Sequence, residues 1–166
     1  MKHTLSIDSP LGVWTLHATP THLTQLTLNA TETPAGHSAT TPAHLPDAAD
    51  RLAAFLAGQP THFDDLPLAP AGTPFQQHVW AALRTIPFGQ TRTYSQLARQ
   101  LGQPKAARAV GAANARNPLP ILIPCHRVIA ASGKLQGFAL GLHLKQKLLD
   151  LEQAQAQARQ YRLLPV

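Results

Sequence analysis

The stretch "TYSQLARQLGQPKAARAVGAANARNP", residues 93–118, predicts two short helices joined by a turn. The Gly-Gln-Pro sequence at residues 102–104 is typical of such a turn, because Gly accepts unusual backbone angles and Pro cannot continue a helix. Asn117 and Pro118 end the second helix in a similar way. The pattern is that of a helix-turn-helix.

The second of these helices has almost no side-chain bulk. Its small residues are Ala106, Ala107, Ala109, Gly111, Ala112, Ala113 and Ala115. Its longer polar side chains are Arg108 and Asn114, and it is flanked by Lys105 and Arg116. Such a helix can pack tightly inside the protein or lie closely against another surface, and the flanking charges favour an external partner.

The charges are divided unevenly along the chain. Residues 1–70 contain two basic and six acidic residues, a net charge of −4, whereas residues 71–166 contain twelve basic and two acidic residues, a net charge of +10. A scattered positive excess is typical of a solvated surface. Its concentration in one half instead favours a polyanionic partner, with nucleic acid first.

The N-terminal half, residues 1–70, predicts a small α/β domain that includes a linker. Apolar and polar residues alternate around Gly and Pro in residues 3–28, as in short antiparallel strands. Residues 29–47 are rich in Ala, Thr and Pro and predict a loop or linker, and residues 48–59 have the apolar spacing of a helix.

The C-terminal half, residues 71–166, predicts a mostly helical domain. Thr73 can cap a helix whose first turn accommodates Pro74 and which Pro87 ends. The predicted helix-turn-helix follows, and residues 141–157 predict a last helix.

The single cysteine, Cys125, follows "LPILIP", residues 119–124, which has the length of a buried strand that Pro124 would end. A lone buried cysteine is more often an inert core residue than a nucleophile. A base and positive charge activate a thiol, and here His126 and Arg127 follow directly. Consecutive side chains of a strand point to opposite faces, so Cys125 and His126 can cooperate only if the backbone turns there.

A histidine base usually has an acid that orients it, and the C-terminal half offers two acids. On the last helix, Glu152 is spaced three and four residues from Leu149 and Leu148, on the face that packs inward, with Lys145 further back on that face. Asp150 falls on the opposite side. A surface glutamate is the alternative interpretation. The spacing favours Glu152 as the interior carboxylate.

Composition argues against several classes of protein. One cysteine excludes an internal disulfide framework, and the N-terminal residues lack the basic and apolar regions of a secretory signal. No apolar run approaches the roughly 20 residues that cross a bilayer. We therefore expect a cytoplasmic protein without a membrane partner. The N-terminal histidines have no metal-ligand spacing, so we expect no metal. We also expect no cofactor, in keeping with the family resemblance described next.

The stretch "IPCHRVI", preceded by "ARAVGAANARNPLPIL" and followed by "SGKLQGF" and "KQKLLDLE", resembles the O6-alkylguanine-DNA alkyltransferases, also called methylated-DNA–protein-cysteine methyltransferases. The resemblance extends in unbroken order from about Phe75 to Glu152, whereas residues 1–70 match only loosely through "SPLGVWTL". It implies a ribonuclease H-like N-terminal domain and a DNA repair protein. Such a protein moves the alkyl group of O6-methylguanine, and also of O4-methylthymine, irreversibly onto its own cysteine.

The resemblance also implies a role for each matching residue. Cys125 would accept the alkyl group, His126 would take its proton through a water molecule, and Glu152 would orient His126. Asn117 would fix the hinge between the second helix of the motif and the cysteine. Tyr94 and Lys145 would help the guanine to leave.

Double-stranded DNA is the partner that the resemblance implies, bound by a monomer, with cooperative binding left open. The bare helix would enter the minor groove, and Arg108 would fill the space of a base flipped out of the duplex. The expected DNA contacts are Tyr94, Ala106, Ala107, Arg108, Ala109, Gly111, Ala112, Asn114 and Arg127. The expected wall of the substrate pocket is Pro120, Val128, Phe138, Ala139 and Leu140, and the last three depart from the family's usual small, Tyr- and Gly-rich loop.

Two other classes are alternatives. One is a non-catalytic module that binds damaged DNA, against which the presence of Cys125 argues. The other is a Cys-His hydrolase, in which the helix-turn-helix and the basic half would have no role.

Overall fold

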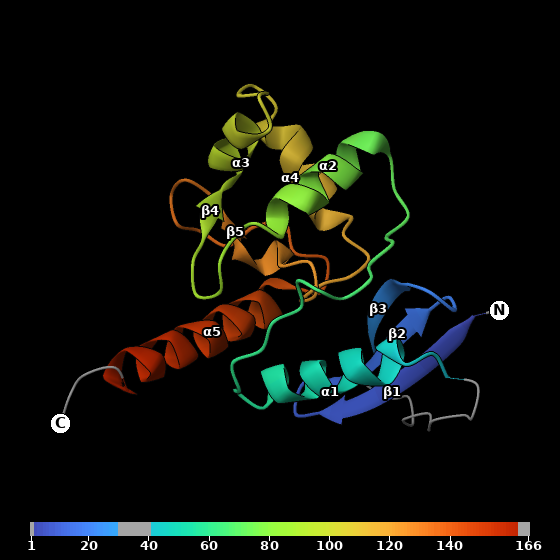
Figure 1. Cartoon of the computed structure of the whole chain (residues 1–166). Helices are drawn as coiled ribbons and strands as arrows, with labels where there is room; N and C mark the ends of the chain where they lie inside the picture. Colours follow the sequence, from blue (N-terminus) through green and yellow to red (C-terminus); the bar gives the residue numbers. More distant parts are fainter. Residues whose placement is uncertain (1, 30–40, 163–166) are drawn as a thin grey trace. The chain divides into compact units, whose positions relative to one another are not determined.

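The computed structural model describes residues 2–29 and 41–162, with side chains up to residue 153. The chain divides into two compact units, Met1–Ala71 and Gly72–Val166 (Figure 1). Each unit contains its own buried apolar side chains, and each is described by itself.

The first unit is a small sheet with a helix on one face. Strands β1 (His3–Ser9), β2 (Gly12–Ala18) and β3 (Leu23–Asn29) are antiparallel in the order β1-β2-β3, as the alternating pattern predicts. Helix α1 (His44–Leu56) packs against β1 and β2 (Figure 1).

Helix α1 begins earlier than the sequence predicts. It starts at His44 and ends at Leu56, whereas the spacing placed it at residues 48–59. Pro46 lies in its first turn, where backbone N–H groups have no partner within the helix, so the missing N–H costs nothing. Leu52 and Phe55 are fully buried. Most of the predicted linker, residues 30–40, lies outside the described residues.

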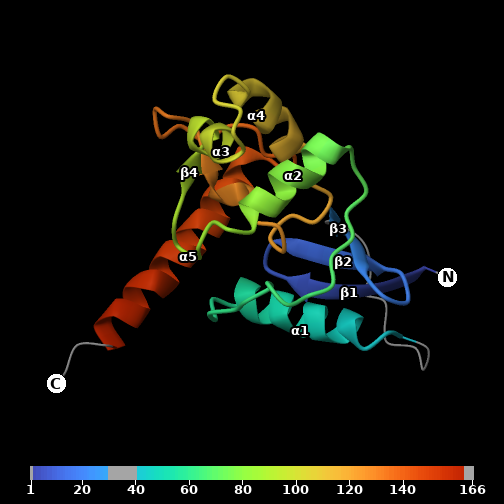
Figure 2. The same cartoon turned by 45° about the horizontal axis from the view of Figure 1, so that its top comes forward.

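The second unit is mostly helical. Its elements are, in chain order, α2 (Pro74–Leu83), β4 (Arg92–Thr93), α3 (Tyr94–Gln100), α4 (Ala107–Ala115), the 3-10 turn η1 (Cys125–Arg127), β5 (Val128–Ile129) and α5 (Leu142–Arg162). Helices α2, α3 and α4 pack against one another (Figure 2), and β4 and β5 form a short parallel pair.

Two capping boxes fix the starts of α2 and α3. The side chains of Thr73 and Thr93 accept hydrogen bonds from the backbone N–H of Gln76 and Gln96, whose side chains accept from the threonine N–H in return. Trp80 Nε1 donates to the carbonyl of Ala113 at 2.9 Å and joins α2 to α4. These contacts fix the frame on which residues 117–129 are held.

Candidate active site

The segment before the cysteine is a tight turn and not the predicted strand. Leu122 N donates to Pro120 O at 2.9 Å and Ile123 N donates to Leu119 O at 2.8 Å. Ile121 has a φ of 72°, which a β-branched residue rarely adopts. The strand prediction for residues 119–124 is therefore wrong. Its apolar residues are buried, but the prolines at 118, 120 and 124 have no N–H to donate to a ladder.

Asn117 holds this turn at both ends. Its Oδ1 accepts from Leu119 N at 3.0 Å, its Nδ2 donates to Ile123 O at 2.8 Å, and its side chain also hydrogen-bonds the Cys125 thiol. The turn delivers Cys125 into η1, so the backbone bends where cooperation with His126 requires it.

Asn114 faces the interior, which contradicts its predicted contact with DNA. It is 1% exposed, and its Nδ2 donates to the carbonyl of Cys125 at 3.3 Å. The reason is helical spacing, because Asn114 lies four residues from Val110 and beside Ala113, both buried. Asn114 therefore holds the backbone of Cys125 from the packed face of α4.

Cys125 is a buried, protonated thiol at neutral pH. Burial raises its pKa to about 11, although the hydrogen bond from Asn117 and the charge of Lys145 act in the opposite direction. A thiol in this state is a poor nucleophile, because the thiolate is the reactive form. Reaction at Cys125 therefore needs a base that removes the proton.

His126, the next residue along η1, is the candidate for that base. Its Nε2 lies 2.7 Å from Glu152 Oε1, and its side chain is fully buried. Burial lowers the pKa of His126, although the carboxylate of Glu152 acts to raise it. In the neutral ring the nitrogen beside a carboxylate carries the hydrogen, so Nε2 donates to Glu152 and Nδ1 has a lone pair for a proton.

Glu152 is the centre of a buried network. Its oxygens accept from Arg127 Nε at 3.0 Å each, from Arg127 Nη2 at 2.8 Å and from Gly89 N at 3.0 Å, besides contacting His126. Burial alone would raise the pKa of Glu152, but the hydrogen bonds and charges of His126 and Arg127 outweigh it and lower the pKa to about 2. Glu152 thus lies inside the unit, as its helical spacing predicts, and is ionised.

Arg127 is not placed to contact DNA, which corrects the sequence prediction. Its side chain is 11% exposed, pairs with Glu152 and donates through Nη1 to Ile86 O at 2.7 Å. Its guanidinium carbon lies 5.7 Å from the centre of the Phe88 ring. Sequence reasoning missed Ile86 and Gly89 as network members, because they act through backbone atoms that leave no residue-type signal.

Lys145 and Tyr94 share an acceptor. Lys145 Nζ donates to Val128 O at 2.5 Å and to Gln136 O at 2.7 Å, and Tyr94 OH donates to Gln136 O at 2.9 Å. Burial lowers the pKa of Lys145 to about 8 and, with the charge of Cys125, raises that of Tyr94. The two donors therefore meet at Gln136 O, and the pKa of each responds to the charge that Cys125 carries as a thiolate.

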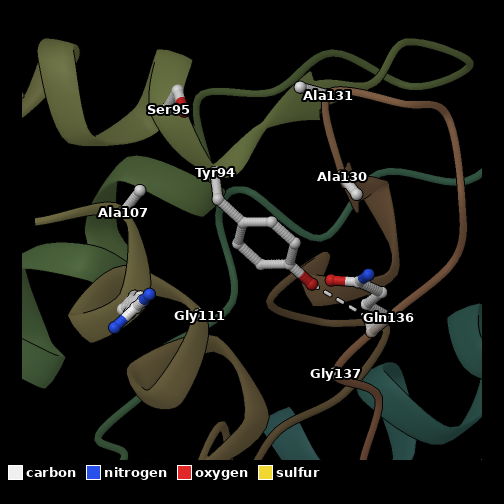
Figure 3. Close-up of a pocket in the computed structure, with 9 residues that line it drawn as sticks. Tyr94, Ser95, Ala107, Gly111, Ala130, Ala131, Gln136 and Gly137 are labelled. Atoms are coloured by element: carbon white, nitrogen blue, oxygen red, sulfur yellow. Dashed lines mark hydrogen bonds between the residues drawn. The ribbon is translucent and has the colours of Figure 1, made fainter.

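A pocket of about 410 Å³ opens at Tyr94 (Figure 3). Its lining residues are Tyr94, Ser95, Ala107, Arg108, Gly111, Ala130, Ala131, Gln136 and Gly137. None of the five predicted wall residues lines this pocket: Pro120, Val128 and Phe138 are buried, Ala139 is exposed and Leu140 is half-buried. The loop after β5 contributes through Gln136 and Gly137 instead, because Tyr94 binds the carbonyl of Gln136.

Helix α4 has one packed face and one open face. Arg108, Ala109 and Ala112 are exposed, whereas Ala106, Ala107 and Gly111 are half-buried. Val110, Ala113 and Asn114 form the packed face. The interpretation of tight packing inside the protein therefore applies to the packed face, and the exposed face carries Arg108, which lines the pocket.

Gly137 supplies a testable constraint on this pocket. Its φ is +62°, and a Cβ there would lie 3.0 Å from Tyr94 OH. Gly137→Ala is expected to lower the free energy of unfolding by more than the about 1–2 kcal/mol of a left-handed alanine alone, because the methyl group also displaces Tyr94. Gly133→Ala is the matched control, since Gly133 has a φ of +80° and open space. Denaturant unfolding compares them, and equal losses would contradict the Tyr94 contact.

Residues 2–29 and 41–162 contain neither a metal-binding cluster nor a membrane-spanning helix. No three His, Cys, Asp or Glu side chains of this part gather to hold a metal ion. None of the helices in this part combines the length and apolar character of a membrane-spanning segment.

Comparisons with known proteins find relatives over nearly the whole chain. Residues 74–154 match the family model of the 6-O-methylguanine DNA methyltransferase, DNA binding domain. A methylated-DNA–protein-cysteine methyltransferase of Mycobacterium bovis is 49% identical over 95% of this chain and 96% of its own.

Solved structures give the same result. The Mycobacterium tuberculosis O6-methylguanine methyltransferase has a TM-score of 0.79 at 47% identity and covers 93% of this chain and 94% of its own. A Mycobacterium tuberculosis OGT in complex with DNA has a TM-score of 0.80 at 47% identity over 92% and 94% of the two chains. On this similarity in sequence and structure, the chain belongs to the methylated-DNA–protein-cysteine methyltransferase family.

Proposed function

We propose that this protein repairs O6-methylguanine in double-stranded DNA by moving the methyl group to Cys125. The observation that carries the proposal is the buried group Cys125, His126 and Glu152. The protonated thiol of Cys125 is followed in sequence by a neutral histidine, and that histidine is hydrogen-bonded to the carboxylate of Glu152. The pocket beside it contains Tyr94 as a hydrogen-bond donor.

The transfer proceeds with a balanced movement of protons. The thiol proton of Cys125 passes through one water molecule to Nδ1 of His126, and the resulting imidazolium is stabilised by Glu152. The thiolate attacks the methyl carbon, an S–C bond forms, and the O6–C bond breaks. Guanine O6 keeps the electron pair, and Tyr94 and Lys145 donate hydrogen bonds to the departing base. The guanine anion then takes up one proton in place of the methyl group, which balances the proton held by His126.

The DNA is held by the helix-turn-helix formed by α3 and α4, with the exposed face of α4 in the minor groove. Alanines at that face permit close contact with the sugar–phosphate backbone, and Arg108 occupies the space of the flipped base. The DNA complex of the Mycobacterium tuberculosis relative supports this partner.

The wider scope of the proposal follows the family resemblance. We include O4-methylthymine as a second substrate, a single transfer per protein molecule, and a cytoplasmic monomer. The three-stranded meander followed by α1 supports a ribonuclease H-like first domain. The second unit is proposed as the DNA-binding and catalytic domain.

Intact mass measurement after incubation with a duplex containing O6-methylguanine tests the proposal. The expected product is protein carrying one methyl group at Cys125 and DNA with an unmodified guanine. Bound DNA without a mass change would indicate a non-catalytic binding module, and cleaved substrate with unmodified protein would indicate a hydrolase.

Arg108→Ala is expected to separate DNA handling from chemistry. Repair of a duplex should slow by about tenfold or more, because the flipped state loses the side chain that fills the stack. Reaction with free O6-methylguanine base should be unchanged. Arg116→Ala is the control for the loss of one positive charge beside α4, and it should slow duplex repair less than Arg108→Ala does. Equal slowing of the free base and the duplex by Arg108→Ala would contradict this role.

A further inference from the structure

Arg127 connects three parts of the second unit around the proposed base. From η1 it donates to both oxygens of Glu152 on α5 and to the carbonyl of Ile86. It also lies over the ring of Phe88. A guanidinium that meets both oxygens of one carboxylate fixes the carboxylate in rotation as well as in charge.

Without Arg127, the carboxylate of Glu152 would prevent His126 from acting as a base. An unpaired buried carboxylate 2.7 Å from an imidazole favours the protonated ring, and an imidazolium cannot accept the proton of a thiol. Burial and the charges of Arg127 and Lys145 act to lower the pKa of His126, whereas Glu152 acts to raise it.

The remaining charged groups around His126 do not replace Arg127. Lys145 of α5 is buried beside Cys125, but its ammonium group donates to the carbonyls of Val128 and Gln136. Helix α2 packs against η1 and has one titratable side chain, the exposed His78. The segment before β4 contacts Glu152 through the backbone N–H of Gly89. The charged side chain of α4, Arg108, is exposed.

We propose that Arg127 is a positioning residue that balances the charge of Glu152, so that Glu152 orients His126 without drawing a second proton onto it. This inference rests on the proposed function, in which His126 must be neutral before the transfer. Arg127 thereby sets the lower pH limit at which Cys125 can be activated.

The pH dependence of the transfer rate constant tests the inference. In Arg127→Gln the fall in rate on the acidic side should move upward by about one pH unit or more, because the ring is then protonated at a higher pH. Arg127→Lys keeps the positive charge, although it loses the contact with both oxygens of Glu152. The fall in rate on the acidic side should therefore lie close to its wild-type pH. Arg116→Gln removes an exposed arginine from the same half and should leave the acid limb unmoved.

The titration of the His126 ring by NMR gives a readout that needs no methyl transfer. The pH at which the His126 ring carbon signal changes, assigned by its loss in His126→Gln, should rise in Arg127→Gln. The double variant Arg127→Gln with Glu152→Gln should bring it down again, because it leaves no unbalanced carboxylate. This neutral pair also keeps the test valid if Arg127→Gln alone does not fold.

Two results would overturn the inference. One is a rate that falls by the same factor at every pH in Arg127→Gln, with no shift of the His126 titration, which would make Arg127 a purely structural contact. The other is a double variant that titrates like Arg127→Gln alone. If instead no methyl group reaches Cys125 while the titrations shift as expected, the proposed function fails and the role of Arg127 toward His126 stands.

Discussion

Cys125→Ser is expected to take up no methyl group from O6-methylguanine DNA while still binding the duplex. The hydroxyl is close in size to the thiol, but a serine is a weak nucleophile unless a base activates it in the transition state. A hydroxyl also loses its proton far less readily than a thiol does. The Asn117 and Asn114 contacts to this segment remain, since three of their four hydrogen bonds involve backbone atoms. Intact mass and gel-shift measurements on the same sample report both properties.

The wild-type protein is the control and carries its own prediction. A thioether at Cys125 has no leaving group that water could displace, so one molecule should accept one methyl group and then stop. Titration of the protein against a methylated duplex should end at equal amounts of methylated protein and repaired DNA. Several repaired lesions per molecule, or a methylated Cys125→Ser protein, would contradict the assignment of Cys125.

Local patterns predicted the parts of the fold that depend on local physics. The alternation in residues 3–28 predicted short antiparallel strands, and three are present, because one face of each strand must be buried. Thr73 with Pro74 predicted the start of α2, where the capping box is observed. The spacing of Glu152 to Leu148 predicted an inward carboxylate, and both residues are buried.

Long-range contacts explain what the sequence did not predict. Arg127 lies in the positively charged half of the sequence, where an arginine is expected to contact DNA. Its partners Ile86 and Glu152 lie 41 and 25 positions away, so no local pattern indicates them. Apolar residues in "LPILIP" are typical of a strand, yet the turn there is closed by Asn117 and by backbone atoms. The pocket is lined by Gln136 and Gly137 because a carbonyl oxygen binds Tyr94, and a carbonyl is present in every residue.

Glu152→Ala is expected to have the largest effect on stability. It leaves the guanidinium of Arg127 and the ring of His126 in a buried site without their carboxylate, and the N–H of Gly89 loses its acceptor. Breaking a buried ion pair on one side costs about 3–5 kcal/mol. The transfer rate should also fall by roughly 10²- to 10⁴-fold, the usual contribution of an acid–base group. Fluorescence in a Trp14→Phe background reports Trp80, and hence the second unit, during denaturant unfolding.

The pH dependence of the free energy of unfolding distinguishes the contribution of the Glu152 charge from that of its packing. The pKa of Glu152 is lowered on folding from its ordinary value of 4.5 to about 2, so its ionisation stabilises the folded protein above pH 4.5. That stabilisation, on the order of 3 kcal/mol, is lost as the pH falls from about 4.5 toward 2. Glu152→Gln keeps the shape of the side chain but has no such loss, so the gap in free energy of unfolding between it and the wild type should narrow between pH 6 and pH 3. A gap that stays constant over this range would show that the Glu152 carboxylate contributes through packing and neutral hydrogen bonds, and the charged network around His126 would have to be abandoned.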